Sequence, residues 1–267
     1  MSKKNKLFQK LFIAAAPFLA SSVLGISPSR AATFASSTSN LEFENFSQAP
    51  SSVSAFADTD ADSQLFGKRA IAGTQTEANA SFIDSPAFAS NENLSKAFGD
   101  NQAYLASAES ESEIIGDFEI KAGNNFSFDF TGNLNLETSI DNPLIENAVS
   151  TGEIFFGLWD IDNETLLDNF SLIGNLTGKD DNDFIELDKS NNVNLNEKFD
   201  TNFGGLEESI EAPIKGSYKR FFANDTNLRL VEFKLNTAIA KAPEPSTGLA
   251  LLLSSGVIGV MLKRRRK

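Results

Sequence analysis

The sequence predicts an all-β protein, an antiparallel β-sandwich or jelly roll, with a signal peptide before it and a transmembrane helix after it. Two observations predict the β class. Apolar and polar residues alternate over long stretches, as in half-buried strands, and no sustained 3.6-residue apolar repeat is present. Runs rich in Asn, Asp and Gly separate these stretches, as expected of turns. With 41% hydrophobic residues and 24 Phe, the chain is apolar enough to bury a substantial core.

The first 31 residues have the pattern of a secretory signal peptide. Four lysines lie within the first ten residues, and an uncharged, largely apolar stretch runs from residue 11 to 26. Ser29 and Ala31 then supply the small side chains that precede a cleaved bond. An uncleaved membrane helix fits less well, because prolines and a glycine interrupt the run. We therefore expect export and cleavage by signal peptidase between Ala31 and Ala32.

Residues 32–242 form a strongly acidic body. They contain 13 basic and 35 acidic residues, a net charge of -22. A surface with this excess repels phosphate backbones, so nucleic acid is excluded as a partner. Divalent cations and neutral polymers remain as ligands, and solvation of the surface is the alternative reason for the charge.

The first part of the body, residues 32–103, is predicted to be loop-rich because Ser, Ala and Asn dominate it. Residues 41–46 and 78–83 are the exceptions, and we expect them to add strands to the same sheets as the rest of the body. A single ectodomain is therefore expected from residue 32 to 242.

Three alternating acidic residues, Asp58, Asp60 and Asp62, suggest a calcium site in this loop-rich part. In a loop, this spacing lets three carboxylates converge on one cation. The rest of an EF-hand is missing, because Ser63 and Arg69 stand where a glycine and a bidentate glutamate are required. The alternative interpretation is that these three residues, like the acidic residues of two later runs, are solvated turn residues.

The clearest strands lie between residues 104 and 240. Residues 104–121 alternate small or apolar side chains with acidic ones, and the alternation resumes over 126–140 after a turn. This pattern predicts a long antiparallel hairpin. Gly116 and Gly132 interrupt its apolar rows, which predicts bulges or the close approach of another segment.

Further strands are predicted at four later segments, residues 166–173, 184–187, 217–222 and 228–235. Residues 154–159 are apolar on both faces, as in a strand near the middle of a sandwich, so Trp159 is expected in the core. In the last segment the apolar positions shift from Leu228 and Leu230 to Val231 and Phe233, which predicts a bulge.

The last 25 residues contain three features in order. Pro243, Glu244 and Pro245 come first, and an uncharged stretch follows from residue 248 to 262. The chain ends in five adjacent basic residues, Lys263, Arg264, Arg265, Arg266 and Lys267. As a helix the uncharged stretch would be about 22 Å long, so it can cross the roughly 30 Å hydrocarbon core only by thinning the bilayer or by snorkelling of its basic tail. The basic residues should stop export and stay in the cytoplasm.

This tripartite tail resembles the PEP-CTERM sorting signal of bacterial exported proteins. The resemblance implies that an exosortase, an integral membrane protease, recognises Pro243, Glu244 and Pro245 and releases the body to the cell envelope or the extracellular polymer. It also implies a bacterium that makes exopolysaccharide. The run from residue 116 to 130 is similar to uncharacterised β-rich ectodomains of such proteins, which implies no activity. An ordinary C-terminal anchor that is never cut is the alternative.

The absence of Cys and His limits the chemistry that this body can perform. Thiol nucleophiles, Ser-His triads and most transition-metal sites are excluded, and no cofactor is expected. We expect a non-catalytic envelope or matrix protein associated with exopolysaccharide. A calcium-assisted carbohydrate-binding module and a secreted carbohydrate-active enzyme are the alternatives. Trp159, Tyr104 and Tyr218 would stack on sugar rings if they were exposed, and no pair of carboxylates stands out as catalytic.

Overall fold

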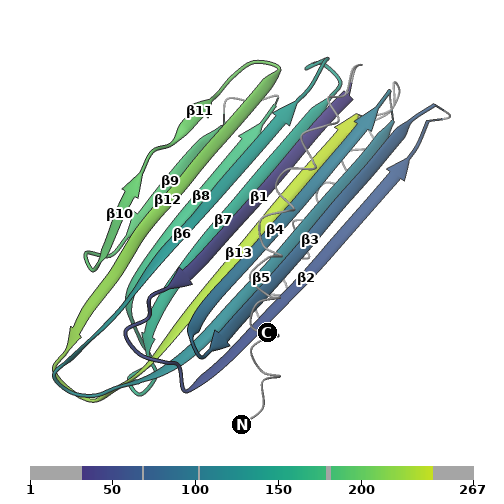
Figure 1. Ribbon diagram of the computed structural model, residues 1–267. Helices are drawn as coiled ribbons and strands as arrows, with labels where there is room; N and C mark the ends of the chain where they lie inside the picture. Colours follow the sequence, from purple (N-terminus) through teal and green to yellow (C-terminus); the bar gives the residue numbers. More distant parts are fainter. Residues whose placement is uncertain (1–31, 68, 102, 179–181, 243–267) are drawn as a thin grey trace, which may run out of the picture. The chain divides into compact units, whose positions relative to one another are not determined.

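In the computed structural model of the protein, residues 32–67, 69–101, 103–178 and 182–242 are described (Figure 1). They form an all-β fold of two antiparallel sheets, which confirms the predicted class. None of the described residues belongs to a helix long and apolar enough to cross a membrane. The predicted signal peptide, the Pro-Glu-Pro motif, the short membrane helix and the basic tail lie outside the described residues.

The first sheet, sheet A, contains β1 (Ala32–Glu44), β3 (Ile71–Asp84), β4 (Ala87–Asp100), β6 (Asn124–Ser139), β10 (Val193–Glu197), β11 (Asp200–Asn202) and β12 (Glu207–Phe222). Its order is β10-β12-β6-β1-β4-β3, and β11 also pairs with β12. The second sheet, sheet B, contains β2 (Ser52–Leu65), β5 (Tyr104–Ile120), β7 (Asn147–Asp160), β8 (Thr165–Thr177), β9 (Phe184–Lys189) and β13 (Thr226–Ala242). Its order is β2-β5-β13-β7-β8-β9.

The two sheets share a core in which side chains form three bands along the strands. On β13 the buried positions are, in order, Leu228, Leu230, Glu232, Lys234, Asn236, Ala238, Ala240 and Ala242. One end of the core is a phenylalanine band, to which antiparallel strands contribute alternately from their first and last parts, and it contains Phe43, Phe118, Phe126, Phe128, Phe130, Phe156 and Phe170. An alanine band lies at the other end and contains Ala35, Ala97, Ala106, Ala108, Ala148, Ala238, Ala240 and Ala242.

A polar band separates these two apolar bands. Its buried members are Ser37, Ser39, Asn91, Asn93, Ser95, Ser110, Ser112, Ser150, Glu232, Lys234 and Asn236. Hydrogen bonds cross between the sheets here. Asn236, for example, donates to Ser37 Oγ at 2.6 Å, and Ser95 Oγ lies 2.8 Å from Ser110 Oγ. Buried polar groups remain compatible with folding when they are paired in this way.

The predicted hairpin between residues 104–121 and 126–140 is wrong. β5 pairs with β2 and β13 in sheet B, whereas β6 pairs with β1 and β12 in sheet A. The chain crosses between the sheets at a turn that contains Gly123, whose φ is 82°. Both strands turn their apolar rows into the same core, where the Phe118 and Phe126 ring centroids are 4.6 Å apart. Alternation identifies the inner face of a strand but not its neighbour.

The predicted bulge in the last strand is also wrong. The register of β13 with β5 and with β7 is continuous. Its inner row continues through Glu232 and Lys234, so Val231 and Phe233 lie half-buried on the outer face. Gly116 marks a close approach instead of a bulge, since a Cβ there would lie 2.4 Å from the Phe82 ring.

Residues 32–103 are not loop-rich, contrary to the prediction. Four strands, β1 to β4, cover most of them. In β4 and the first part of β1 the inward positions carry mostly Ala, Ser and Asn, which suit the polar and alanine bands but lack the usual large apolar signal. β2 is an edge strand whose side chains are exposed along its whole length, so its sequence carries no core pattern.

Candidate functional site

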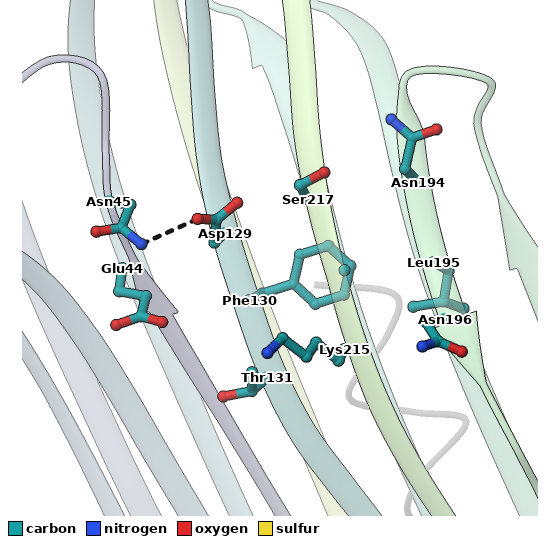
Figure 2. A pocket seen from close by; sticks show the side chains of 11 residues that line it. Glu44, Asn45, Asp129, Phe130, Thr131, Asn194, Leu195, Asn196, Lys215 and Ser217 are labelled. Carbon is teal, nitrogen blue, oxygen red and sulfur yellow. Dashed lines mark hydrogen bonds between the residues drawn. The ribbon is translucent and has the colours of Figure 1, made fainter.

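An open groove lies on sheet A where β1, β6, β12 and β10 run side by side (Figure 2). Its volume is about 560 Å³, in the range of small-molecule sites. Polar side chains predominate among the residues that line it, which are Glu44, Asn45, Asp129, Phe130, Thr131, Asn194, Leu195, Asn196, Lys215, Gly216 and Ser217.

The strand register arranges these polar side chains in two rows across the sheet. One row runs over all four strands and consists of Glu44, Asp129, Ser217 and Asn194. The next row runs over β6, β12 and β10 and consists of Thr131, Lys215 and Asn196. Because the rows are two residues apart on each strand, they lie about 7 Å from each other. The groove therefore presents repeated hydrogen-bonding groups in a regular array.

Asn45 and Gly216 shape the two sides of the groove. Asn45 has a φ of 56°, in the left-handed region that Asn tolerates, and this ends β1. Its carboxamide then donates a hydrogen bond to Asp129 Oδ2 at 2.9 Å (Figure 2). At Gly216 a Cβ would lie 2.3 Å from the Phe130 ring, so only glycine lets this ring pack against β12. The ring lies behind the strand in Figure 2.

The groove can both donate and accept hydrogen bonds. Lys215 and the asparagine side chains supply N–H donors, and the two carboxylates supply acceptors. The Thr131 and Ser217 hydroxyls can do either. A ligand rich in hydroxyl groups, which also donate and accept, would match this set of side chains.

A smaller hollow of about 250 Å³ lies at one end of β6 and β12 and contains a paired carboxyl group. Glu208 is 5% exposed and accepts a hydrogen bond from Thr138 Oγ1 at 2.9 Å and one from the Gly204 N–H at 3.2 Å. Burial raises the pKa of Glu208, and the charge of Asp183 beside it adds to the effect. This carboxyl group is therefore biased towards its protonated form.

The three residues of the hypothetical calcium site lie along an exposed strand and not in a loop. Asp58, Asp60 and Asp62 share the outer face of β2 at intervals of about 7 Å, and Asp58 and Asp60 lie opposite Glu111 and Glu109 of β5. Among the described residues, no group of three or more His, Cys, Asp or Glu side chains is placed to hold a metal ion. Acidic side chains on an edge strand discourage another strand from pairing with it, which is a sufficient reason for their presence.

Of the three aromatic residues that would stack on sugar rings if they were exposed, only Trp159 reaches the surface. Tyr104 and Tyr218 are buried, at 2% and 0% exposure. Trp159 is not in the core as expected, because it is 36% exposed on the outer face of sheet B. β7 is an interior strand of the sheet, as predicted, but its outer row, with Phe155 and Trp159, faces away from the core. The Trp159 indole packs over Gly157, where a Cβ would lie 3.1 Å from Nε1.

A buried carboxylate that is surrounded by hydrogen-bond donors was not predicted from the sequence. Asp168, 4% exposed, accepts hydrogen bonds from Tyr218 Oη at 2.9 Å, from Arg220 Nη1 at 2.8 Å and from Asn192 Nδ2 at 3.0 Å. Burial raises the pKa of Tyr218, and the charge of Asp168 adds to the effect. Leu167, the residue before Asp168, has no partner on β7, so β8 has a bulge of one extra residue there. The bulge changes the side of the sheet to which the following residues point, and this turns Asp168 inward. Every hydrogen-bonding side chain of this cluster is engaged within the fold, so its role is structural.

Comparisons with known proteins give no further information on function, so the proposal below rests on the fold, on these sites and on the sequence. No protein-family model, no curated protein and no solved structure matches this chain.

Proposed function

We propose that the protein is a non-catalytic exported protein of the bacterial cell envelope or extracellular matrix, a jelly-roll-like β-sandwich that associates with neutral exopolysaccharide. The observation that carries the proposal is the groove on sheet A, where two rows of polar side chains run across four strands. A regular array of donors and acceptors suits a polymer of repeated hydroxyl-bearing units. The net charge of -22 over residues 32–242 favours neutral over acidic polymers.

The proposed route to the cell surface rests on the two ends of the sequence. Signal peptidase would cut after Ala31, and the C-terminal helix would hold the precursor in the inner membrane. An exosortase would then act at Pro243, Glu244 and Pro245. β1 begins at Ala32 and β13 ends at Ala242, so both cuts would fall outside the two sheets.

Removing two groove carboxamides tests the proposed binding. The double variant Asn194→Ala/Asn196→Ala should bind a neutral polysaccharide such as hydroxyethyl cellulose at least about fivefold more weakly, since each lost hydrogen bond contributes about 0.5–1.5 kcal/mol. Both side chains are exposed on β10, so the fold should not change. Affinity electrophoresis in gels with and without the polysaccharide measures the effect.

The matched control is Gln75→Ala/Asn79→Ala, which removes two exposed carboxamides from β3 of the same sheet, outside the groove. Its mobility should equal that of the wild type in both gels. Equal retardation of the groove variant and the control would contradict the assignment of the groove. An unretarded wild type in hydroxyethyl cellulose, dextran and alginate gels alike would contradict polysaccharide binding.

A secreted carbohydrate-active enzyme is the second candidate function, and Glu208 is the observation that favours it. A general acid is a carboxyl group whose pKa is raised by its surroundings beside a second carboxylate, and Glu208 beside Asp183 fits this description. Release of reducing sugar by the wild type, abolished in Glu208→Gln, would favour this function over the first. No release from any polysaccharide that the protein binds would favour the non-catalytic function.

A further inference from the structure

The middle of the polar band holds two ionisable side chains that are completely enclosed. Glu232 and Lys234 of β13 are both 0% exposed. They are two residues apart on the same strand face and point towards β4 of the opposite sheet. Transferring a charged group into such surroundings is costly unless it is paired or neutralised.

Asn91 of β4 contacts both side chains. Its main-chain oxygen accepts a hydrogen bond from Lys234 Nζ, and its Nδ2 donates one to Glu232 Oε2. The other two oxygens of this contact, Asn91 Oδ1 and Glu232 Oε1, are buried and have no hydrogen-bond partner among the described residues. An ionised carboxylate cannot satisfy the amide oxygen, because both oxygens only accept hydrogen bonds.

We propose that Glu232 is protonated in the folded protein and that its carboxyl O–H donates to Asn91 Oδ1. The proton turns one of the two unpartnered oxygens into a donor for the other. Together with the existing Nδ2–H bond it closes a ring of two hydrogen bonds between an acid and an amide. The ring connects β13 of sheet B to β4 of sheet A. It is the same whichever way the Asn91 amide is oriented, because the acid can donate from either oxygen.

The surroundings of Glu232 favour the neutral acid. Burial raises the pKa of Glu232 to about 8, against the opposing effects of the Lys234 charge and of the hydrogen bond from Asn91, and the charge of Glu113 of β5 adds to the rise. Burial likewise lowers the pKa of Lys234 to about 8, and the charges of Glu232, of Glu92 of β4 and of Glu42 of β1 oppose this change. The neighbours directly beside Glu232 do not titrate, since they are Ile114 of β5 and Phe156 of β7.

The ring makes the attachment of the two sheets sensitive to pH. The unfolded chain releases the Glu232 proton near pH 4.5, whereas the folded chain keeps it until about pH 8. Between these values the folded state binds more protons, so the free energy of unfolding falls as the pH rises. Above about pH 8 the proton leaves, and the second hydrogen bond is replaced by two acceptors facing each other. The sheets should therefore be held most firmly together in acidic and neutral surroundings.

Glu232→Gln separates this proposal from a general effect of pH. A Gln amide can donate to Asn91 Oδ1 and accept from Nδ2, so it rebuilds the ring without a titrating proton. Urea unfolding of the full chain should show that the variant matches the wild type near pH 5. Between pH 5 and 8 the unfolding equilibrium constant of the wild type should rise relative to that of the variant, by up to about tenfold per pH unit. Parallel profiles, or a variant much less stable than the wild type at pH 5, would overturn the proposal.

A measurement on the wild type keeps the proposal testable if the variant does not fold. In protein labelled with ¹³C at the Glu carboxyl carbon, one resonance should keep the chemical shift of a protonated acid at pH 7 and titrate only near pH 8. A spectrum in which every Glu carboxyl is ionised at pH 7 would contradict a protonated Glu232. A protonated resonance that belongs to Glu208 is distinguished by its loss in Glu208→Gln.

Discussion

Replacing Phe128 with Ala should lower the free energy of unfolding by about 3–5 kcal/mol. Phe128 is 1% exposed at the centre of the phenylalanine band. Its ring centroid lies within 6.4 Å of six other aromatic rings, those of Phe43, Phe46, Phe126, Phe130, Phe156 and Tyr218. Truncation removes buried apolar area and leaves a cavity that these rings, held by two sheets, can fill only in part.

Urea unfolding monitored by circular dichroism measures this loss. Phe221→Ala is the matched control, because Phe221 is 59% exposed on β12 and its truncation should cost no more than about 0.5 kcal/mol. If the two variants were equally stable, the placement of Phe128 in a core shared by the two sheets would be contradicted.

Replacing Asp168 with Ala should cost about 3 kcal/mol or more. The change leaves the Tyr218 hydroxyl without its buried acceptor and Arg220 without its carboxylate, and removing one partner of a buried pair is strongly destabilising. Arg220 also lies over the Phe222 ring at 5.7 Å, so the loss of its anchor should loosen the end of β12. Hydrogen exchange should report this as faster exchange of the β8 and β12 amides.

The exposed Lys121–Asp225 pair, with an N–O distance of 3.3 Å, provides the comparison for Asp168. Surface ion pairs contribute little, so Asp225→Ala should leave the unfolding curve close to that of the wild type. Asp168→Asn, which keeps an acceptor oxygen but no charge, should fall between the two. A wild-type unfolding curve for Asp168→Ala would show that the cluster does not stabilise the fold.

The sequence was sufficient to predict the all-β class and several of the strands, but not how the strands pair. Alternation gave the inner faces of β5 and β6, because small or apolar side chains recur there with a strong period of two. It could not show that β5 and β6 belong to different sheets, because pairing depends on contacts between distant segments. β4 and the first part of β1 were missed because their inner rows contain small and polar residues that match the polar and alanine bands of the opposite sheet, and β2 was missed because it is exposed along its whole length.

The candidate sites were harder to predict for the same reason. Asn45, Asp129 and Asn194 lie far apart in the chain and meet only through the register of β1, β6, β12 and β10. Glu232 and Lys234 looked like an interruption of an apolar row and suggested a bulge. In the fold they continue that row, and the hydrogen bonds from β4 that make this tolerable are invisible in the local sequence.

Intact mass spectrometry of the protein in the surface or medium fraction tests the central claim, that an acidic β body is exported and separated from both of its ends. The mass should correspond to a chain that begins at Ala32 and ends no later than Pro245. Glu244→Ala should remain at full C-terminal length in the inner membrane, because the change removes the glutamate of the proposed sorting motif. A surface protein that retains residues 1–31, or residues beyond 245, would contradict the account.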